Sequence, residues 1–282
     1  MLKIWITGST GQIGAAINKV LNPLGYEVFE TYHDVLDITD LDQVLNFCKV
    51  NRPQVIINCA GIASEKECSN NPELAYKVNS LGARNIAIAA FKINAKVVQI
   101  STDDVFDGKN DLPITEFEPT NPISVYGKSK LCGENFVKEF APKHFIIRSS
   151  WVYGSGNNFV TYILEKAKRG EALNISKNQV GSPTSAKELA SFIIYIINTN
   201  EYGTYHFTCD GRCSRIAFTK EILKLANLKN IKINEVDKID SEYSLNHPSY
   251  AVLDNFIIRL ENKYKAKSWQ DALLEYIKEL KS

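Results

Sequence analysis

The sequence predicts an α/β fold built on a doubly wound parallel sheet, with a smaller C-terminal lobe. Short apolar segments alternate with helical segments over residues 1–150, a glycine-rich loop joins the first strand to the first helix, and the alternation loosens after residue 150. Strands that alternate with helices form βαβ units, whose right-handed crossovers give a parallel, Rossmann-type sheet. We expect a first domain over residues 1–150 and a second lobe, mainly residues 151–282, interleaved with it because no flexible linker intervenes.

The first half supplies strands and helices in turn. Residues 2–7 are an apolar run that ends at glycines, and runs without polar alternation are typical of strands buried on both faces. The first helix ends near Pro23 and Gly25; the second begins with Thr39 as its expected cap and stops before Pro53. The expected strands are residues 2–7, 26–31, 54–61, 95–102 and 144–150, and the expected helices are residues 12–25, 39–52, 72–94 and one carrying residues 124–134.

The second half is richer in helical segments separated by short strands and turns. No internal repeat or low-complexity tract is present. Apolar residues recur at helical spacing in four segments, residues 157–170, 185–198, 215–228 and 269–282.

Composition and charge exclude several classes of protein. Among 282 residues, 33 basic and 32 acidic residues leave a formal charge of +1, which gives no basic field for nucleic acid. No stretch approaches the roughly 18–20 apolar residues of a membrane span. The six cysteines show no disulfide framework or zinc spacing, so we expect free thiols, no metal site and a cytoplasmic protein.

A glycine loop follows the first strand directly. Gly8, Gly11 and Gly14 have the spacing G-x-x-G-x-x-G at the mouth of the first helix, where backbone N–H groups and the helix dipole favour a pyrophosphate. A tight structural turn is the alternative, but the strand–loop–helix context favours dinucleotide binding. Glu30 or Thr31 ends the second strand, and neither decides between NAD and NADP.

A tyrosine and a lysine stand four residues apart in the segment "SVYGKSK". Tyr126 and Lys130 share one face of a helix, and Thr102 ends the strand of residues 95–102. We expect the Lys130 ammonium to lower the Tyr126 pKa, Tyr126 to give a proton to a carbonyl oxygen, and Thr102 to donate to the same oxygen. Such a pair occurs by chance on many helices; its combination with the glycine loop makes it specific.

Several motifs together resemble the extended short-chain dehydrogenase/reductases, and within them the dTDP-4-dehydrorhamnose reductase family. They are "TGSTGQIG", "STDDVF", "VYGKSK", "WVYG", "LDITD", "NCAG", "ELAYKVN", "GNNFV", "NQVGSPT" and "YHFTCDG", spread over residues 3–280. The resemblance implies reduction of the 4-keto group of a nucleotide-linked 6-deoxyhexose, most directly dTDP-4-dehydrorhamnose to dTDP-L-rhamnose, with NADPH or NADH. It also suggests a homodimer and, as in some members, Mg²⁺.

The resemblance implies a role for each matching residue. Thr102, Tyr126 and Lys130 would be catalytic. The cofactor would contact Gly8, Gly11, Gln12, Ile13, Gly14, Asp37, Ile38, Cys59, Ala60, Gly61 and Asn79, together with Tyr126 and Lys130. The substrate would contact Asp104, Val105, Phe106, Trp151, Asn158 and Gln179.

The chain departs from the family pattern where substrate contacts are expected. Asp104 replaces a tyrosine, residues 62–67 read "IASEKE", Arg215 replaces a tryptophan and His247 replaces an arginine. Because a neutral imidazole cannot copy the two parallel bonds of an arginine to a diphosphate, the departures indicate either a different nucleotide sugar or drift.

Two other functions stay open. One is an epimerase or dehydratase that retains its cofactor, in which Asp103 or Asp104 would serve as acid/base. The other is a dinucleotide-binding regulatory subunit without catalysis, against which the complete set of Thr102, Tyr126 and Lys130 argues.

Overall fold

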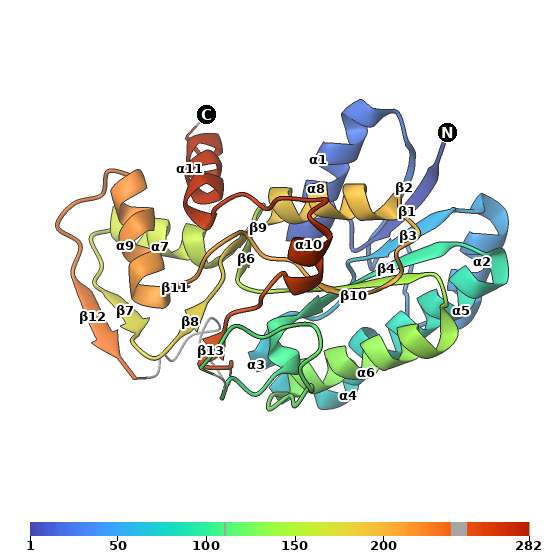
Figure 1. The fold of residues 1–282 in the computed structure, drawn as a ribbon, viewed down its shortest axis with the longest axis horizontal. Helices are drawn as coiled ribbons and strands as arrows, with labels where there is room; N and C mark the ends of the chain where they lie inside the picture. Colours follow the sequence, from blue (N-terminus) through green and yellow to red (C-terminus); the bar gives the residue numbers. More distant parts are fainter. Residues whose placement is uncertain (110, 238–246, 282) are drawn as a thin grey trace.

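Six parallel strands form one sheet in the larger part of the molecule (Figure 1). The computed structural model describes residues 1–109, 111–237 and 247–281. The strand order is β10-β5-β4-β3-β1-β2, and the order reverses between β1 and β3. The doubly wound parallel sheet expected from the sequence is therefore confirmed. The strands are β1 (Lys3–Thr7), β2 (Glu27–Thr31), β3 (Val55–Asn58), β4 (Lys96–Thr102), β5 (His144–Ser149) and β10 (Gly203–His206).

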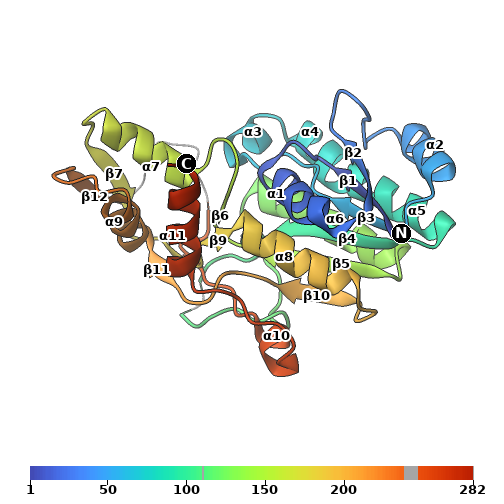
Figure 2. The same ribbon diagram turned by 90° about the horizontal axis from the view of Figure 1, so that it is seen from above.

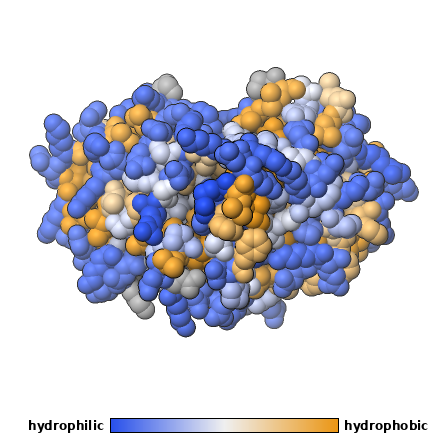
Figure 3. Space-filling view, in the orientation of Figure 1, coloured by the Kyte–Doolittle hydropathy of each residue, from blue (hydrophilic) through white to orange (hydrophobic). Residues whose placement is uncertain are grey.

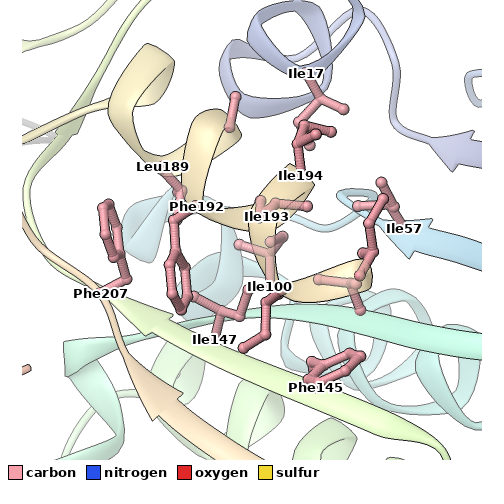
Figure 4. Close-up of a cluster of buried hydrophobic side chains, with 14 of the residues drawn as sticks. Ile17, Ile57, Ile100, Phe145, Ile147, Leu189, Phe192, Ile193, Ile194 and Phe207 are labelled. Atoms are coloured by element: carbon pink, nitrogen blue, oxygen red, sulfur yellow. The ribbon is translucent and has the colours of Figure 1, made fainter. Parts of the chain in front are cut away.

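Helices cover both faces of this sheet. On one face α1 packs against α8; on the other α5 packs against both α2 and α6 (Figure 1). The first face buries an apolar cluster that includes Ile17 of α1, Ile57 of β3 and Phe192 of α8 (Figure 4). Burial of such side chains contributes roughly 1.5–3 kcal/mol each. The helices are α1 (Gln12–Leu21), α2 (Leu41–Asn51), α5 (Ala83–Ile93), α6 (Val125–Phe140) and α8 (Ala186–Ile197).

A smaller lobe lies to one side of the sheet and carries its own apolar core (Figure 2). Two strands of the lobe, β7 and β12, pair in parallel, and β8 pairs with both β11 and β13. Strand β10 and helix α8 come from beyond residue 150 yet belong to the large sheet and its cover. The lobe contains α7 (Phe159–Lys168), α9 (Arg215–Leu225), α11 (Trp269–Glu279), β7 (Leu173–Ser176), β8 (Val180–Gly181), β11 (Cys213–Ser214), β12 (Ile233–Val236) and β13 (Tyr250–Ala251).

The remaining elements are short. They are α3 (Glu65–Asn70), α4 (Pro72–Tyr76), α10 (Phe256–Glu261), the paired strands β6 (Val152–Tyr153) and β9 (Thr184–Ser185), and two 3-10 turns (Asn22–Leu24 and Asp103–Val105).

Two local predictions differ from the structure. Asp40, not Thr39, caps α2, because its carboxylate accepts hydrogen bonds from the backbone N–H groups of Asp42 and Gln43. The expected single helix over residues 72–94 contains a π-helical segment, Lys77–Gly82, between α4 and α5. This segment carries Asn79, which anchors the loop beside the candidate site.

The surface and the cysteines agree with the composition. Polar residues cover most of the face seen in Figure 3, and hydrophobic residues form separate patches on it. All six cysteines are free. Within the described residues, no helix is long and apolar enough to cross a membrane, and no cluster of three or more His, Cys, Asp or Glu could hold a metal ion.

Candidate active site

A cavity of about 520 Å³ opens at the carboxyl ends of β1, β3 and β4. In doubly wound sheets this edge, near the point where the strand order reverses, is where ligands bind. The glycine loop and the tyrosine–lysine pair both line the cavity, and residues of the C-terminal lobe form its other side.

The glycine loop is shaped so that side chains would not fit. Gly8 has a φ of +63°, and a Cβ there would lie 2.7 Å from the backbone nitrogen of Ala60. A Cβ on Gly14 would lie 2.4 Å from the carbonyl oxygen of Gly8. The loop thus brings bare backbone to the N-terminus of α1, whose free N–H groups fit the pyrophosphate of a dinucleotide.

Thr102, Tyr126 and Lys130 meet in this cavity. Ser124 caps α6 by accepting a 2.9 Å hydrogen bond from the backbone N–H of Gly127, so the helix starts one residue before Tyr126. One turn later the Lys130 ammonium donates a 2.6 Å bond to the carbonyl oxygen of Ile100. Burial lowers the pKa of Lys130 to about 8.

The pKa of Tyr126 shifts in the direction opposite to the prediction. Burial raises it above the ordinary value, and the Asp104 carboxylate raises it further, against a hydrogen bond with Thr102 that lowers it. The prediction that Lys130 brings the Tyr126 pKa down is wrong for this structure. Tyr126 therefore holds its proton at neutral pH, as a proton donor in a reduction should.

The Thr102 hydroxyl lies between two carboxylates. Its Oγ1 is 3.1 Å from Oδ1 of Asp103 and 3.3 Å from Oδ2 of Asp104, and it accepts a bond from the Asp104 backbone N–H. Asp103 also accepts a 3.0 Å bond from the Ser150 hydroxyl. Burial, followed by the charge of Asp104, raises the pKa of Asp103 to about 7.

Asp104 and His247, which are 143 positions apart, form a contact across the cavity. The His247 Nδ1 lies 2.9 Å and 3.0 Å from the two carboxylate oxygens of Asp104. Burial acts to lower the pKa of His247, but the charge and hydrogen bond of Asp104, with the charge of Asp103, raise it above the ordinary value. The imidazolium form is therefore favoured next to these carboxylates.

Arg215 is a buried cation that faces the same cavity. Its guanidinium carbon lies 3.4 Å from the ring centroid of Trp151 and 4.5 Å from that of Phe159. In the described part of the chain, its Nε has no hydrogen-bond partner. Burial lowers its pKa to about 9, and the charge of Asp103 acts against that.

Comparisons with known proteins agree with this geometry. A family model described as the RmlD substrate binding domain matches residues 2–282. A solved dTDP-4-dehydrorhamnose reductase from Clostridium acetobutylicum superposes with a TM-score of 0.95 at 41% identity, with both chains fully covered. The chain belongs to the dTDP-4-dehydrorhamnose reductase family.

Two further relatives extend the comparison. The dTDP-4-dehydrorhamnose reductase of Bacillus anthracis, solved in complex with NADP, has a TM-score of 0.93 at 37% identity and 99% coverage of both chains. The spore coat polysaccharide biosynthesis protein SpsK of Bacillus subtilis is 34% identical over 100% of this chain and 99% of its own. The family comprises NAD(P)-dependent oxidoreductases.

Of the residues that the family resemblance assigns to the cofactor, eight line the cavity and five do not. Ile38 is buried, and its carbonyl accepts a bond from Asn85, so it holds the loop after β2. Asn79 bonds both the N–H and the carbonyl of Ile62 and the hydroxyl of Ser129, so it positions the cavity wall from behind. The lining set is Gly11, Gln12, Ile13, Gly14, Cys59, Gly61, Tyr126 and Lys130; the other set is Gly8, Asp37, Ile38, Ala60 and Asn79.

Three of the six expected substrate residues, Asp104, Trp151 and Asn158, line the cavity. The Asn158 side chain caps α7 and bonds Gly154, Gly156 and Tyr276, so its amide is used by the fold. The other three, Val105, Phe106 and Gln179, do not line it.

Val105 and Phe106, expected to contact the substrate, lie in the core and not in the cavity wall. They pack with Ile114 and Leu253 in a small apolar cluster. Asp103 and Asp104, the first two residues of the 3-10 turn, line the cavity, whereas the side chains at the end of the turn point into the core. Gln179 is buried, and its backbone carbonyl accepts a bond from the Arg215 N–H.

Sequence reasoning missed several residues of the cavity wall. Residues 62–64 appear in the sequence analysis only as a departure from the family pattern. They follow the carboxyl end of β3, at the same sheet edge at which Thr102 ends β4, and that position was the available signal. No comparable sequence signal marks the lobe residues, because only tertiary packing brings them to the cavity wall. The missed residues include Ile62, Ala63, Ser64, Ile100, Ser149, Val152, Tyr153, Asn157, Phe159, Phe218 and Pro248.

Proposed function

We propose that the protein reduces the 4-keto group of a nucleotide-activated 6-deoxyhexose, with dTDP-4-dehydrorhamnose, giving dTDP-L-rhamnose, as the first candidate. The observation that carries the proposal is the meeting of the glycine loop with Thr102, Tyr126 and Lys130 around one cavity. Family membership and the NADP complex of the Bacillus anthracis relative support it.

The residues of the chain divide the work of the reduction. A reduced nicotinamide, when bound, supplies the hydride. Tyr126, whose pKa is raised, retains its proton until a carbonyl oxygen accepts it. The Thr102 hydroxyl, which hydrogen-bonds Tyr126, can turn to the same oxygen and stabilise the charge that develops there. The Lys130 ammonium is held by its hydrogen bond to the Ile100 carbonyl oxygen and places a positive charge one helical turn after Tyr126 on α6.

On the opposite side of the cavity, Arg215 supplies a cation for the diphosphate of a nucleotide sugar. The guanidinium stacks on the Trp151 ring, which holds the side chain in place and leaves its N–H groups available to donate hydrogen bonds to the diphosphate. The Nε of Arg215 has no hydrogen-bond partner among the described residues, so an anionic ligand could accept a hydrogen bond from it.

The test is an assay of reduced-cofactor oxidation with a panel of 4-keto-6-deoxy nucleotide sugars, each tried with NADPH and NADH. We expect loss of reduced-nicotinamide absorbance with at least one sugar and formation of its 4-hydroxy product. Purification with tightly held oxidised nicotinamide, without net cofactor oxidation, would favour an epimerase or dehydratase instead. Cofactor binding with no turnover on the whole panel would favour a regulatory subunit.

Three expectations stay predictions: a homodimer and Mg²⁺ binding, which rest on the resemblance, and a cytoplasmic location, which rests on the free cysteines. Sedimentation of the purified protein with Mg²⁺ and with EDTA tests the first two together. A sedimenting mass of two chains would support the homodimer, and a loss of activity on adding EDTA that Mg²⁺ restores would support the metal.

A further inference from the structure

We propose that His247, Asp104 and Thr102 form a proton relay that restores the proton of Tyr126 after each reduction. The inference rests on the proposed reductase function and concerns a step that function leaves open. A tyrosine that has given its proton to the substrate must regain one before the next turnover.

The four side chains form a continuous chain of contacts. Tyr126 hydrogen-bonds the Thr102 side chain. Thr102 Oγ1 lies 3.3 Å from Oδ2 of Asp104, and both carboxylate oxygens of Asp104 lie within 3.0 Å of the His247 Nδ1. Every link joins two groups that can each release and accept a proton.

Exposure along this chain gives the relay a direction. The Asp104 side chain is 4% exposed and Thr102 is 5% exposed, whereas 25% of the His247 side chain is exposed. His247 is therefore the end at which water can exchange a proton. Lys130 offers no matching exit, because it is buried and its ammonium is bonded to the Ile100 carbonyl.

The transfer balances without a further reactant. Nδ1 of the His247 imidazolium gives its proton to the Asp104 carboxylate, the carboxyl so formed gives a proton to the Thr102 oxygen, and the Thr102 hydroxyl proton moves to the tyrosinate oxygen. The net change is one proton lost by His247 and one gained by Tyr126. The neutral imidazole then recovers its proton from water.

The charges that face His247 favour the proton-loaded ring. Asp104 and Asp103 raise its pKa, whereas burial and Arg215 lower it, and the balance lies above the ordinary value. The sign follows directly: the relay is loaded below the His247 pKa and is emptied as pH rises through it.

The test uses two variants and one matched control. His247→Gln keeps a donor for Asp104 but does not titrate, Asp104→Asn removes the carboxylate, and His144→Gln changes a histidine at the start of β5 outside the cavity. The measurement is kcat against pH from about pH 5 to about pH 9. It is made in H₂O and D₂O with a substrate that the wild type reduces.

We expect the wild-type kcat to fall as pH rises through the His247 pKa, and His144→Gln to do the same. His247→Gln should lose this falling limb and lower kcat by between about tenfold and about a hundredfold. Its solvent isotope effect should increase, and added imidazole should restore part of the rate. Asp104→Asn should also lower kcat and lose the falling limb, because an amide at this position cannot pass a proton from His247 to Thr102.

Three results would overturn the relay. They are a wild-type kcat that is constant over the pH range, a falling limb that survives in His247→Gln, and a rise in KM alone with kcat and pH profile unchanged. The first needs no variant, so the relay stays testable even where a variant does not fold. Absence of wild-type turnover on every sugar would instead contradict the proposed function.

Discussion

The two walls of the cavity are built by different kinds of contact. The cofactor wall, made by the glycine loop with Thr102, Tyr126 and Lys130, comes from the first 130 residues and follows strand ends and one helix face. The lobe wall, made by Trp151, Arg215 and His247, comes from segments that only tertiary packing brings to the site.

The two walls differ in the hydrogen-bond partners of their buried cations. In the cofactor wall, the Lys130 ammonium donates a 2.6 Å hydrogen bond to a backbone carbonyl oxygen, so its charge already has a partner within the protein. Arg215 has an aromatic partner but none for its Nε in the described residues, so the lobe wall has charge left to offer a ligand. We infer that the cofactor wall sets the chemistry and the lobe wall selects the substrate.

The largest effect is expected from the cofactor wall, at the proton donor. Tyr126→Phe should lower kcat by between about a hundredfold and about ten-thousandfold, because the ring is kept and the proton is lost. Cofactor affinity, followed by fluorescence titration, should change little. Tyr195→Phe on α8 lies outside the cavity and is the matched control. Equal activity of the two variants would remove Tyr126 from the mechanism.

The second largest effect concerns the glycine loop. Gly14→Ala places a Cβ where the carbonyl of Gly8 stands 2.4 Å away, so the loop must shift from the helix N-terminus. We expect the Kd of the reduced cofactor to rise at least about tenfold, which is about 1.4 kcal/mol. Gly25→Ala is the control: its backbone is strained at a φ of +72°, but the new Cβ meets no atom within 4 Å. It should therefore lower stability and leave cofactor affinity unchanged. Unchanged cofactor affinity in Gly14→Ala would contradict a pyrophosphate site here.

The same division explains what could be predicted from the sequence. The alternation of apolar and helical segments, the glycine spacing and the four-residue step from Tyr126 to Lys130 are local features, and the structure has them as expected. The pairing of Asp104 with His247 spans 143 positions, and no local pattern marks it. The direction of the Tyr126 pKa shift also depended on burial and on a carboxylate placed by packing, which spacing on a helix cannot give.

A smaller effect is expected from the lobe wall. Arg215→Met keeps much of the side-chain volume and removes the cation, so KM for the nucleotide sugar should rise about tenfold with little change in kcat. The melting temperature should not fall, because the lost charge is buried at the N-terminus of α9, where the helix dipole opposes it. Arg212→Met, an exposed arginine outside this cavity, is the control. A fall in melting temperature with unchanged KM would make Arg215 a packing residue only.

The smallest effect is on stability and lies where the two walls meet, at Asp103. Its pKa is raised from 3.8 to about 7 by burial and by Asp104, so the folded state binds a proton more tightly than the unfolded chain does. This contribution to stability is present below the unfolded pKa and is lost as pH rises from about 4 to about 7. Asp103→Asn removes the titration and should flatten the decline in the free energy of unfolding across that window.

Asp107→Asn supplies a control of opposite sign for this last prediction. The Lys109 backbone N–H and the Asn121 amide lower the pKa of Asp107, so its contribution is present above the unfolded pKa and lost as pH falls. Urea unfolding at a series of pH values separates the two variants. Asp103→Asn should gain stability relative to the wild type toward neutral pH, whereas Asp107→Asn should lose it there. If Asp103→Asn followed the wild-type pH dependence, the carboxylate beside Thr102 would be ionised at neutral pH, and the negative charge that keeps Tyr126 protonated would come from Asp103 as much as from Asp104.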